Sequence, residues 1–430
     1  MNLILAESRR LRFFTLSMLY LAQGFPFGLV NTALPAYLAE QGQSAAAIGS
    51  FIALANLPWS FKLLAGPFMD RWTFLSMGRR RPWVILAQSC MVLTGLAFIL
   101  FPDGLSDVGL LAILCFTLNV FGASQDVAVD GMAIDVLPPE EHGRANAFMA
   151  FGQVAGISIS TAISAFVVIN FGMTGIGLLL AVSFGLILIV ALAVRERSGE
   201  KTLPWSKGEA SQRSLDLKPD SWRVIAVDLL RVILLPASIF IFGTAFIFRF
   251  SYGVWISLAP IAVVQEVGLS STDYSSFISG VGFLAAIAGL ALGVVIDKKG
   301  IKFFYAVVLA LYGALCIFIG LMHSSWSSIN FLIVVGVVQA FIYQGGFISF
   351  IASCMKLCWQ KVSATQFAIY MAGANVGLSL GAATYAALER YLSSSQIFIV
   401  LGFVFFVGVL LVWLTNFEKH DYDVMALDQN

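Results

Sequence analysis

Apolar residues along the chain gather into long runs that are separated by short polar or Gly/Pro-containing breaks. Each run approaches or exceeds the roughly 20 residues that an α-helix needs to cross a bilayer. The runs fall at residues 13–37, 47–69, 83–101, 108–136, 144–170, 173–194, 232–264, 272–296, 303–322, 327–355, 362–388 and 396–416. This pattern predicts an all-α integral membrane protein with twelve transmembrane helices.

The composition agrees with that pattern and excludes several classes of protein. Hydrophobic residues make up 59% of the 430 residues and charged residues only 11%, whereas soluble domains have about 45–50% and about 25%. A globular enzyme, a secreted disulfide scaffold, a disordered hub and a nucleic-acid binder are therefore excluded. The three histidines lie far in sequence from Cys354 and Cys358, so we expect neither a metal site nor a cofactor.

The basic residues are distributed unevenly among the predicted loops. With the N-terminus inside, 22 of the 25 Lys and Arg residues fall on the cytoplasmic side, and Arg390 alone falls in an outer loop. Lys62 and Arg249 lie within spans. An excess of Lys and Arg marks cytoplasmic loops. The chain is therefore expected to span the cytoplasmic (inner) membrane several times, with both termini in the cytoplasm.

A polar stretch near the middle of the chain predicts how it divides. The expected parts are an N-terminal six-helix half at 1–195, a flexible cytoplasmic linker at 196–230, a C-terminal six-helix half at 231–417 and a cytoplasmic tail at 418–430. The halves also echo each other, because residues 66–71 after the second span correspond to residues 293–298 after the eighth. Parallel repeats of this kind predict two pseudo-symmetric halves around a cavity that opens alternately to either side.

Several motifs resemble those of a known family. Residues 66–71 and the basic residues 79–81 resemble the signature loop of the major facilitator superfamily. More narrowly, residues 57–62, 69–73 and 124–131 look like the AmpG-type muropeptide permease and acetyl-coenzyme A transporter branch. The resemblance implies the major facilitator fold and a carrier for a sizeable, polar, anionic solute. One departure is Gly131, where an aromatic residue often follows the second aspartate of the motif.

Two aspartates of the fourth span are candidates for proton coupling. Asp126 and Asp130 are four residues apart and share one helix face. A charge at the bilayer centre costs roughly 2.5–3.5 kcal/mol on insertion scales, so each carboxylate needs an explanation. Two carboxylates one turn apart in a low dielectric are expected to share protons. The alternative is that both only hold spans together through hydrogen bonds.

Two basic residues within spans are candidates for substrate binding. Arg249 lies near the middle of the seventh span, and its planar fork suits a substrate carboxylate or phosphate, or an ion pair with Asp126 or Asp130. A permanently paired structural arginine is the alternative. Lys62 lies eight residues before Asp70, about 12 Å along a helix, and either contacts substrate or extends towards the cytoplasm.

Polar side chains of the first and tenth spans complete the predicted substrate site. They are Tyr20, Gln23 and Asn31 in the first span and Gln339, Tyr343 and Gln344 in the tenth. The superfamily resemblance implies that the first, fourth, seventh and tenth spans line the cavity. Such residues also serve as contacts between helices, and that interpretation stays open.

A network of charges is predicted to form an inner gate. Asp135 is nine residues after Asp126, which places it on the opposite side of the helix, at the cytoplasmic end. There it suits pairing with Arg71 and Arg144, as the resemblance also implies. The full predicted network comprises Asp70, Arg71, Arg79, Arg80, Asp135, Arg144, Asp297 and Lys298.

Together these features predict a proton-coupled secondary active transporter, and not an enzyme, that imports a polar, anionic solute such as an anhydro-muropeptide by alternating access. Its expected partners are the small-molecule solute, protons and the lipid bilayer, without nucleic acid, and we expect a monomer. A glycoside–cation symporter is the alternative. A membrane-embedded enzyme is a weaker one, because His142, His323 and His420 fall in predicted loops or the tail.

Overall fold

The computed structural model describes residues 3–72, 74–138, 141–212, 215, 222–359 and 363–428, and some side chains inside these ranges are left undescribed. Within this part the chain is helical, and its extended segments form a single isolated bridge, between Ile4 and Arg195. The chain folds as two compact units. Unit 1 comprises Met1–Tyr37 and Phe61–Pro219, and unit 2 comprises Leu38–Ser60 and Asp220–Asn430.

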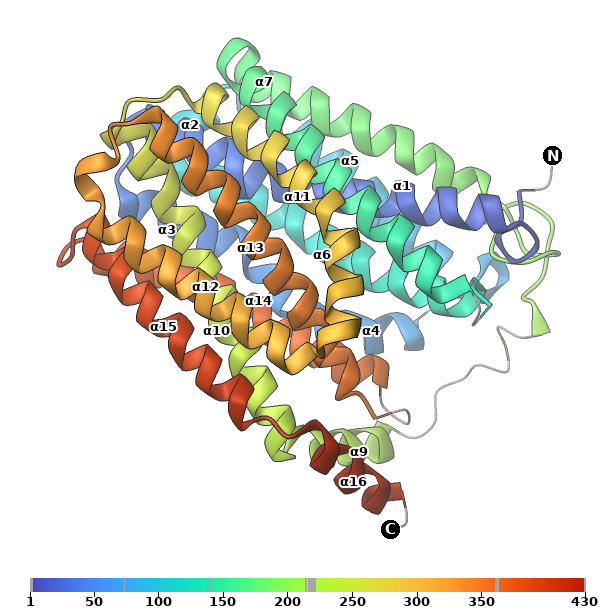
Figure 1. The fold of residues 1–430 in the computed structure, drawn as a ribbon. Coiled ribbons are helices and arrows are strands. Elements are labelled where there is room, and N and C mark those ends of the chain that lie inside the picture. The colour runs from blue at the N-terminus through green and yellow to red at the C-terminus, as the bar shows by residue number, and fades with distance from the viewer. Residues whose placement is uncertain are drawn as a thin grey trace. The chain divides into compact units, whose positions relative to one another are not determined.

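The helices follow the predicted apolar runs (Figure 1). Those of the first part of the chain are α1 (Arg9–Gly28), α2 (Leu34–Glu40), α3 (Ala45–Asn56), α4 (Lys62–Arg71), α5 (Arg81–Ile99), α6 (Val108–Val136) and α7 (His142–Ala193). Those of the second part are α9 (Trp222–Ile233), α10 (Pro236–Pro260), α11 (Ser271–Lys299), α12 (Ile301–Leu321), α13 (Ile329–Lys356), α14 (Ser363–Leu388), α15 (Ser394–Leu414) and α16 (Phe417–Asp428). A π-helical turn, η2 (Leu29–Ala33), joins α1 to α2, and another, η7 (Ile261–Glu266), extends α10.

The described helices confirm an all-α membrane protein, and their number is consistent with twelve spans. Nine helical segments in the described part of the chain are long and apolar enough to cross a membrane. One of these, Phe148–Ala193, contains two spans, because Gly172 takes φ 57° and ψ −151° and breaks α7. The other two spans are α11 and the segment from α3 to α4, which the short 3-10 helix η3 (Leu57–Ser60) interrupts.

Close contacts at glycines hold the helices of unit 1 together. A Cβ added at Gly156 of α7 would overlap the backbone carbonyl oxygen of Leu21 in α1, and one added at Gly152 would overlap that of Ser17. Lipid chains are as apolar as the helix surfaces, so small residues that allow close backbone approach are an important source of helix association in membranes. The α1–α7 pair therefore gives α1 a fixed position from which Tyr20 extends.

Unit 2 uses the same type of contact and includes a segment from the first half of the sequence. A Cβ at Gly253 of α10 would overlap the carbonyl oxygen of Leu378 in α14. On α3, a Cβ at Gly49 would lie 2.7 Å from the carbonyl oxygen of Ala382, also in α14. Residues 38–60 therefore belong structurally to unit 2, and the chain passes to unit 1 between η3 and α4.

Replacing Gly156 by alanine is expected to destabilise the protein. The added methyl group would force α1 and α7 apart, and overpacking of this kind costs about 1–3 kcal/mol. Gly185 lies on the same helix with open space around it, so Gly185→Ala is the matched control and is expected to be neutral or slightly stabilising. Thermal unfolding of the purified variants tests this, and equal unfolding temperatures would contradict it.

Candidate functional site

Asp126 forms an ion pair with Lys62 inside unit 1. The Lys62 Nζ lies 2.8 Å from the Asp126 Oδ2, and the two side chains are only 12% and 7% exposed. Lys62 begins α4 directly after the break at η3, and this local change of direction presents its side chain to α6. The buried Asp126 carboxylate therefore accepts the Lys62 ammonium group, and a substrate contact by Lys62 stays a prediction.

Asp130, one turn further along α6, has a different partner. The Tyr20 hydroxyl of α1 donates a hydrogen bond to the Asp130 carboxylate. The two aspartates therefore lie on one face of α6 as predicted, one beside a cation and the other beside a neutral phenol. We call Tyr20, Lys62, Asp126 and Asp130 the carboxylate cluster. With both aspartates ionised, the cluster carries one more negative than positive charge.

The other polar residues predicted on the first span lie inside the helix packing. Gln23 is fully buried, and neither atom of its amide has a hydrogen-bond partner among the described residues. Asn31 is buried within the π-helical turn η2. Gln125, beside Asp126, donates its amide N–H to the Leu19 carbonyl at 3.2 Å. These amides lie close in sequence to the carboxylate cluster, and a role for Gln23 and Asn31 in substrate binding stays a prediction.

Arg249 of α10 is surrounded by neutral groups in unit 2. Its Nη1 donates to the Tyr343 hydroxyl at 3.0 Å and its Nη2 to the Asn375 Oδ1 at 3.3 Å. The guanidinium carbon lies 5.5 Å from the centre of the Tyr252 ring, which stacks on Tyr343 at 4.2 Å. Arg249 is 7% exposed, and none of its partners within the described residues is a carboxylate. Among the described side chains of unit 2, its positive charge therefore has only neutral partners.

The two glutamines predicted on the tenth span make contacts between helices. Gln339 donates its Nε2 to the Tyr312 hydroxyl of α12 at 2.7 Å. Gln344 packs against Gly289 of α11, where a Cβ would lie 2.9 Å from its Nε2. Of the three residues predicted on this span, Tyr343 is therefore the one that contacts Arg249. Substrate contact by Gln339 and Gln344 stays a prediction.

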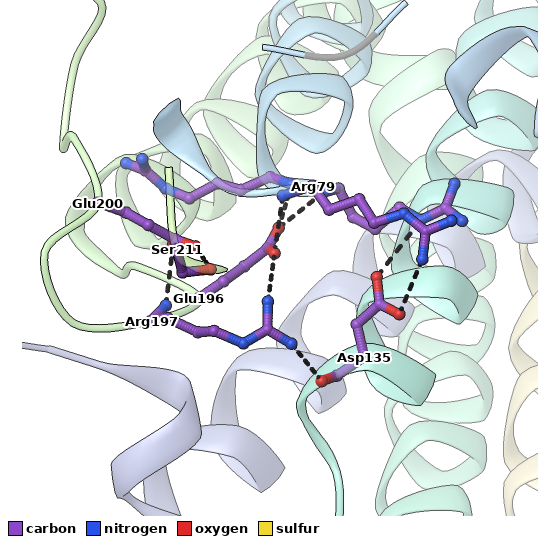
Figure 2. A network of polar contacts seen from close by, with 8 residues as sticks. Arg79, Asp135, Glu196, Arg197, Glu200 and Ser211 are labelled. Atoms are coloured by element: carbon purple, nitrogen blue, oxygen red, sulfur yellow. Dashed lines mark hydrogen bonds and ion pairs between the residues drawn. The ribbon is translucent and has the colours of Figure 1, made fainter. Parts of the chain in front are cut away.

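Asp135 lies in an arginine cluster at the end of α6 (Figure 2). Its carboxylate is 3.4 Å from the Arg79 Nη1 and 3.7 Å from the Arg80 Nε. Gly131 leaves room for Arg80, because a Cβ there would lie 2.6 Å from the Arg80 Nε. The side chains of the remaining gate candidates lie outside the described residues, namely Asp70, Arg71, Arg144, Asp297 and Lys298.

Glu196, just after α7, organises the loop that carries these arginines. Its carboxylate accepts hydrogen bonds from three successive backbone N–H groups, those of Arg79 at 2.9 Å, Arg80 at 2.8 Å and Arg81 at 2.6 Å. Glycine is required at position 78, which has φ 105° and where a Cβ would lie 2.7 Å from the Glu196 carboxyl carbon. Complete burial raises the pKa of Glu196, and the three amides partly oppose that shift.

The first part of the predicted linker packs against the rest of unit 1 through specific hydrogen bonds. The fully buried Arg81 guanidinium donates to the backbone carbonyls of Ala191, Leu192, Lys201 and Thr202 at 2.7–3.1 Å. Arg197 donates to the Asp135 carbonyl oxygen at 2.7 Å (Figure 2). We call residues 195–211 the docked segment. The segment is polar, but its charged residues Glu196, Arg197 and Glu200 have specific protein partners.

Sequence reasoning missed Glu196, Arg81, Tyr252 and Asn375. Tyr252 is three residues after Arg249, so helical spacing alone would have placed it on the same face. Asn375 is an isolated amide in an apolar run, and such a residue within the bilayer needs a partner. Glu196 carried no comparable signal, because an acid between two arginines in a polar stretch is typical of a solvated surface.

Comparison with known proteins identifies the family. The sequence profile of the Major Facilitator Superfamily matches residues 16–258 and 241–423, and the chain belongs to this superfamily of membrane transporters. It is 26% identical over 373 residues to the anhydromuropeptide permease of Escherichia coli K12, an alignment that covers 83% of this chain and 70% of the permease.

Solved structures agree on the fold. A D-xylose–proton symporter superposes with a TM-score of 0.69 at 14% identity, over 93% of this chain and 97% of the symporter. A POT family transporter in complex with a thioalcohol-conjugated peptide superposes with a TM-score of 0.68 at 12% identity, over 93% of this chain and 95% of that one. In the described part of this chain, no group of three or more His, Cys, Asp or Glu side chains is placed to hold a metal ion.

The docked segment is expected to loosen as the pH rises. Burial and the neighbouring Glu196 raise the pKa of Glu200 to about 7, from about 4.3 in an unfolded chain. The folded protein therefore binds this proton more tightly, and the associated stability is fully present below about pH 4.3 and is lost as the pH rises through about 7. Amide hydrogen exchange of residues 195–211, corrected for the chemical exchange rate, should show decreasing protection between pH 5 and 8.

Glu200→Gln is expected to remove this pH dependence, because the amide cannot ionise. Glu209→Gln is the matched control, since Glu209 is exposed in the same segment. An unchanged pH dependence in Glu200→Gln would contradict the assignment to Glu200.

Proposed function

We propose that this chain is a proton-coupled secondary active transporter that imports a polar, anionic solute such as an anhydro-muropeptide. In this proposal it is a monomer in the cytoplasmic (inner) membrane with both termini inside, and it works by alternating access. Membership of the superfamily supports transport, and the similarity to the E. coli anhydromuropeptide permease supports the solute class. The charges inside the two units support the coupling and the anionic character.

The observation that carries the proposal is the carboxylate cluster, in which two aspartates share one ammonium group. Lys62 neutralises Asp126 at 2.8 Å, whereas Asp130 receives a hydrogen bond from the neutral Tyr20. An excess charge inside a transmembrane helix is costly, so uptake of one proton on Asp130 brings the cluster to neutrality. Asp130 is therefore the proposed proton carrier, and Asp126 fixes Lys62 beside it.

Arg249 supports an anionic solute over a neutral sugar. Its described partners are two hydroxyl- or amide-bearing side chains and an aromatic ring. A buried cation without a counter-charge is unfavourable, and a substrate carboxylate or phosphate would supply that charge through two parallel hydrogen bonds. A glycoside–cation symporter remains the second candidate, and it would leave Arg249 without an anion. Likeness to the xylose symporter concerns the fold alone.

The contacts of residues 38–60 support alternating access. The Gln265 side chain donates to the carbonyl oxygens of Ala39 and Gln43, each at 2.8 Å. The Ser271 hydroxyl donates to the Glu40 carboxylate. These polar contacts join the end of α2 and the residues just after it to η7 and the start of α11, apart from the packing of α3 on α14, so they can open while that packing is kept. In the proposed cycle they release when the opposite side closes.

Asp130→Asn is expected to abolish accumulation driven by a pH gradient, because the amide cannot carry the proton. Exchange of labelled for unlabelled solute should persist, since exchange needs no net proton movement. Asp126→Asn is also expected to abolish driven accumulation, because Lys62 is then neutralised by Asp130 alone and holds that carboxylate ionised. Uptake of radiolabelled anhydro-muropeptide into proteoliposomes measures both, with Asp103→Asn, an exposed loop aspartate, as the control. Unchanged driven uptake in both variants would remove the coupling role.

Cross-linking of residues 40 and 271 tests alternating access. In Glu40→Cys with Ser271→Cys, a short reducible bifunctional thiol reagent should hold the end of α2 on the start of α11 and stop uptake, and a reductant should restore it. The two single variants are the controls for modification of the native cysteines. Full uptake by a cross-linked double variant would show that this contact does not open during transport.

A further inference from the structure

Unit 2 contains an aromatic cavity that the site described above does not use. It holds about 310 Å³ and lies between α10 with η7, α11, α13 and the beginning of α15. Its aromatic walls are formed by Trp255, Tyr274, Phe277, Trp326, Phe331 and Phe398. Small residues leave the space open, namely Ala259 and Ala262 on one side and Gly336 on the other. Such a lining suits an aliphatic or acyl group.

The walls of this cavity continue the helix faces that carry the Arg249 site. On α10, Trp255 follows Tyr252 by three residues, and Ala259 follows Trp255 by four. On α13, Gln339 precedes Tyr343 by four residues. Residues three or four apart share a helix face. With a rise of 1.5 Å per residue, the cavity wall at Trp255 begins about 9 Å along α10 from Arg249.

The side chains change from charged to apolar along this line. Tyr252 and Tyr343 stack beside the guanidinium. Gln339 comes next, and its Nε2 donates a hydrogen bond to the Tyr312 hydroxyl. Tyr312 in turn meets Trp255 edge to face, with ring centroids 6.0 Å apart. Beyond this point the lining is predominantly apolar, so one ligand can meet a cation at one end and an aromatic cavity at the other.

We propose that unit 2 binds an amphipathic anion, with its carboxylate or phosphate on Arg249 and an acyl or aliphatic arm in the aromatic cavity. This inference rests on the proposed transport of an anionic solute, and it adds the substrate feature that sets affinity. Arg249 has only neutral contacts among the described residues of unit 2 and lies one to two turns from the cavity, which favours a charged ligand over a lipid chain as the occupant. Burial of each additional methylene group should tighten binding about fourfold.

Equilibrium binding of N-acylglycines tests the proposal without any need for transport or a proton gradient. Tritiated acetyl-, butanoyl- and hexanoylglycine are titrated against the full chain in phosphatidylcholine nanodiscs, with empty nanodiscs as background. The dissociation constant is expected to fall about fourfold per methylene. Arg249→Gln should weaken all three acids by a similar factor, because it removes the charge and leaves the cavity intact. Equal dissociation constants of the three acids in the wild-type protein would overturn the proposal.

Two variants change the cavity in opposite directions. Ala259→Leu should fill it, so that acetylglycine binds as before while the gain with chain length disappears. Phe331→Ala should enlarge it, so that octanoylglycine binds more tightly than hexanoylglycine by a larger factor than in the wild-type protein. Unchanged length dependence in both variants would overturn the assignment to this cavity. Retained binding of acetylglycine shows that each variant is folded.

Binding of the uncharged N-hexanoylglycinamide distinguishes a site for a charged substrate from a site for a membrane lipid chain. It should bind at least tenfold more weakly than hexanoylglycine, because it offers Arg249 no charge. Equal affinities of the amide and the acid would overturn the proposal in favour of a lipid-chain site. These binding measurements need no uptake. Failure of the proton-coupling proposal in the earlier uptake test would therefore not change the result expected here.

Discussion

The ion pair between Lys62 and Asp126 is the interaction on which the proposed mechanism of unit 1 depends. A lone ammonium or carboxylate at membrane depth is unfavourable, but at 2.8 Å the two compensate each other. The pair also affects its neighbour, because Asp130 accepts a hydrogen bond from the Tyr20 phenol and shares the Lys62 ammonium group with Asp126. The cluster has one carboxylate more than it has ammonium groups, and the proposed cycle alternates between its protonated and deprotonated forms.

Outside the membrane-spanning helices, unit 1 relies on a different type of interaction. The Glu196 carboxylate accepts hydrogen bonds from three adjacent backbone amides. The Arg81 guanidinium donates hydrogen bonds to four backbone carbonyl groups. Each buried charge is thus surrounded by dipoles of the opposite sense. This arrangement gives the loop at residues 78–81 a defined shape, which in turn fixes the positions of Arg79 and Arg80 around Asp135.

The sequence predicted the helices well because the bilayer imposes a length and an apolar composition on each span. Helical spacing also placed Asp126 and Asp130 on one face. It could not identify their partners, because Lys62 and Tyr20 reach α6 from distant parts of the chain. The docked segment is a second case in which the partners lie outside the reach of sequence patterns. Residues 195–211 are polar enough to resemble a flexible linker. Only the three-dimensional arrangement shows that Glu196 accepts hydrogen bonds from three backbone amides.

Asn375 has a consequence for communication between the charges. Its side-chain oxygen accepts from Arg249, while its nitrogen donates to the backbone carbonyl of Trp59 at 3.3 Å. Trp59 is only three residues before Lys62, the partner of Asp126. The Asn375 side chain therefore joins Arg249 to η3, the 3-10 helix that comes directly before Lys62 and α4. In the proposed cycle, an anion that changes the Arg249–Asn375 contact would therefore act on a backbone group only three residues before Lys62.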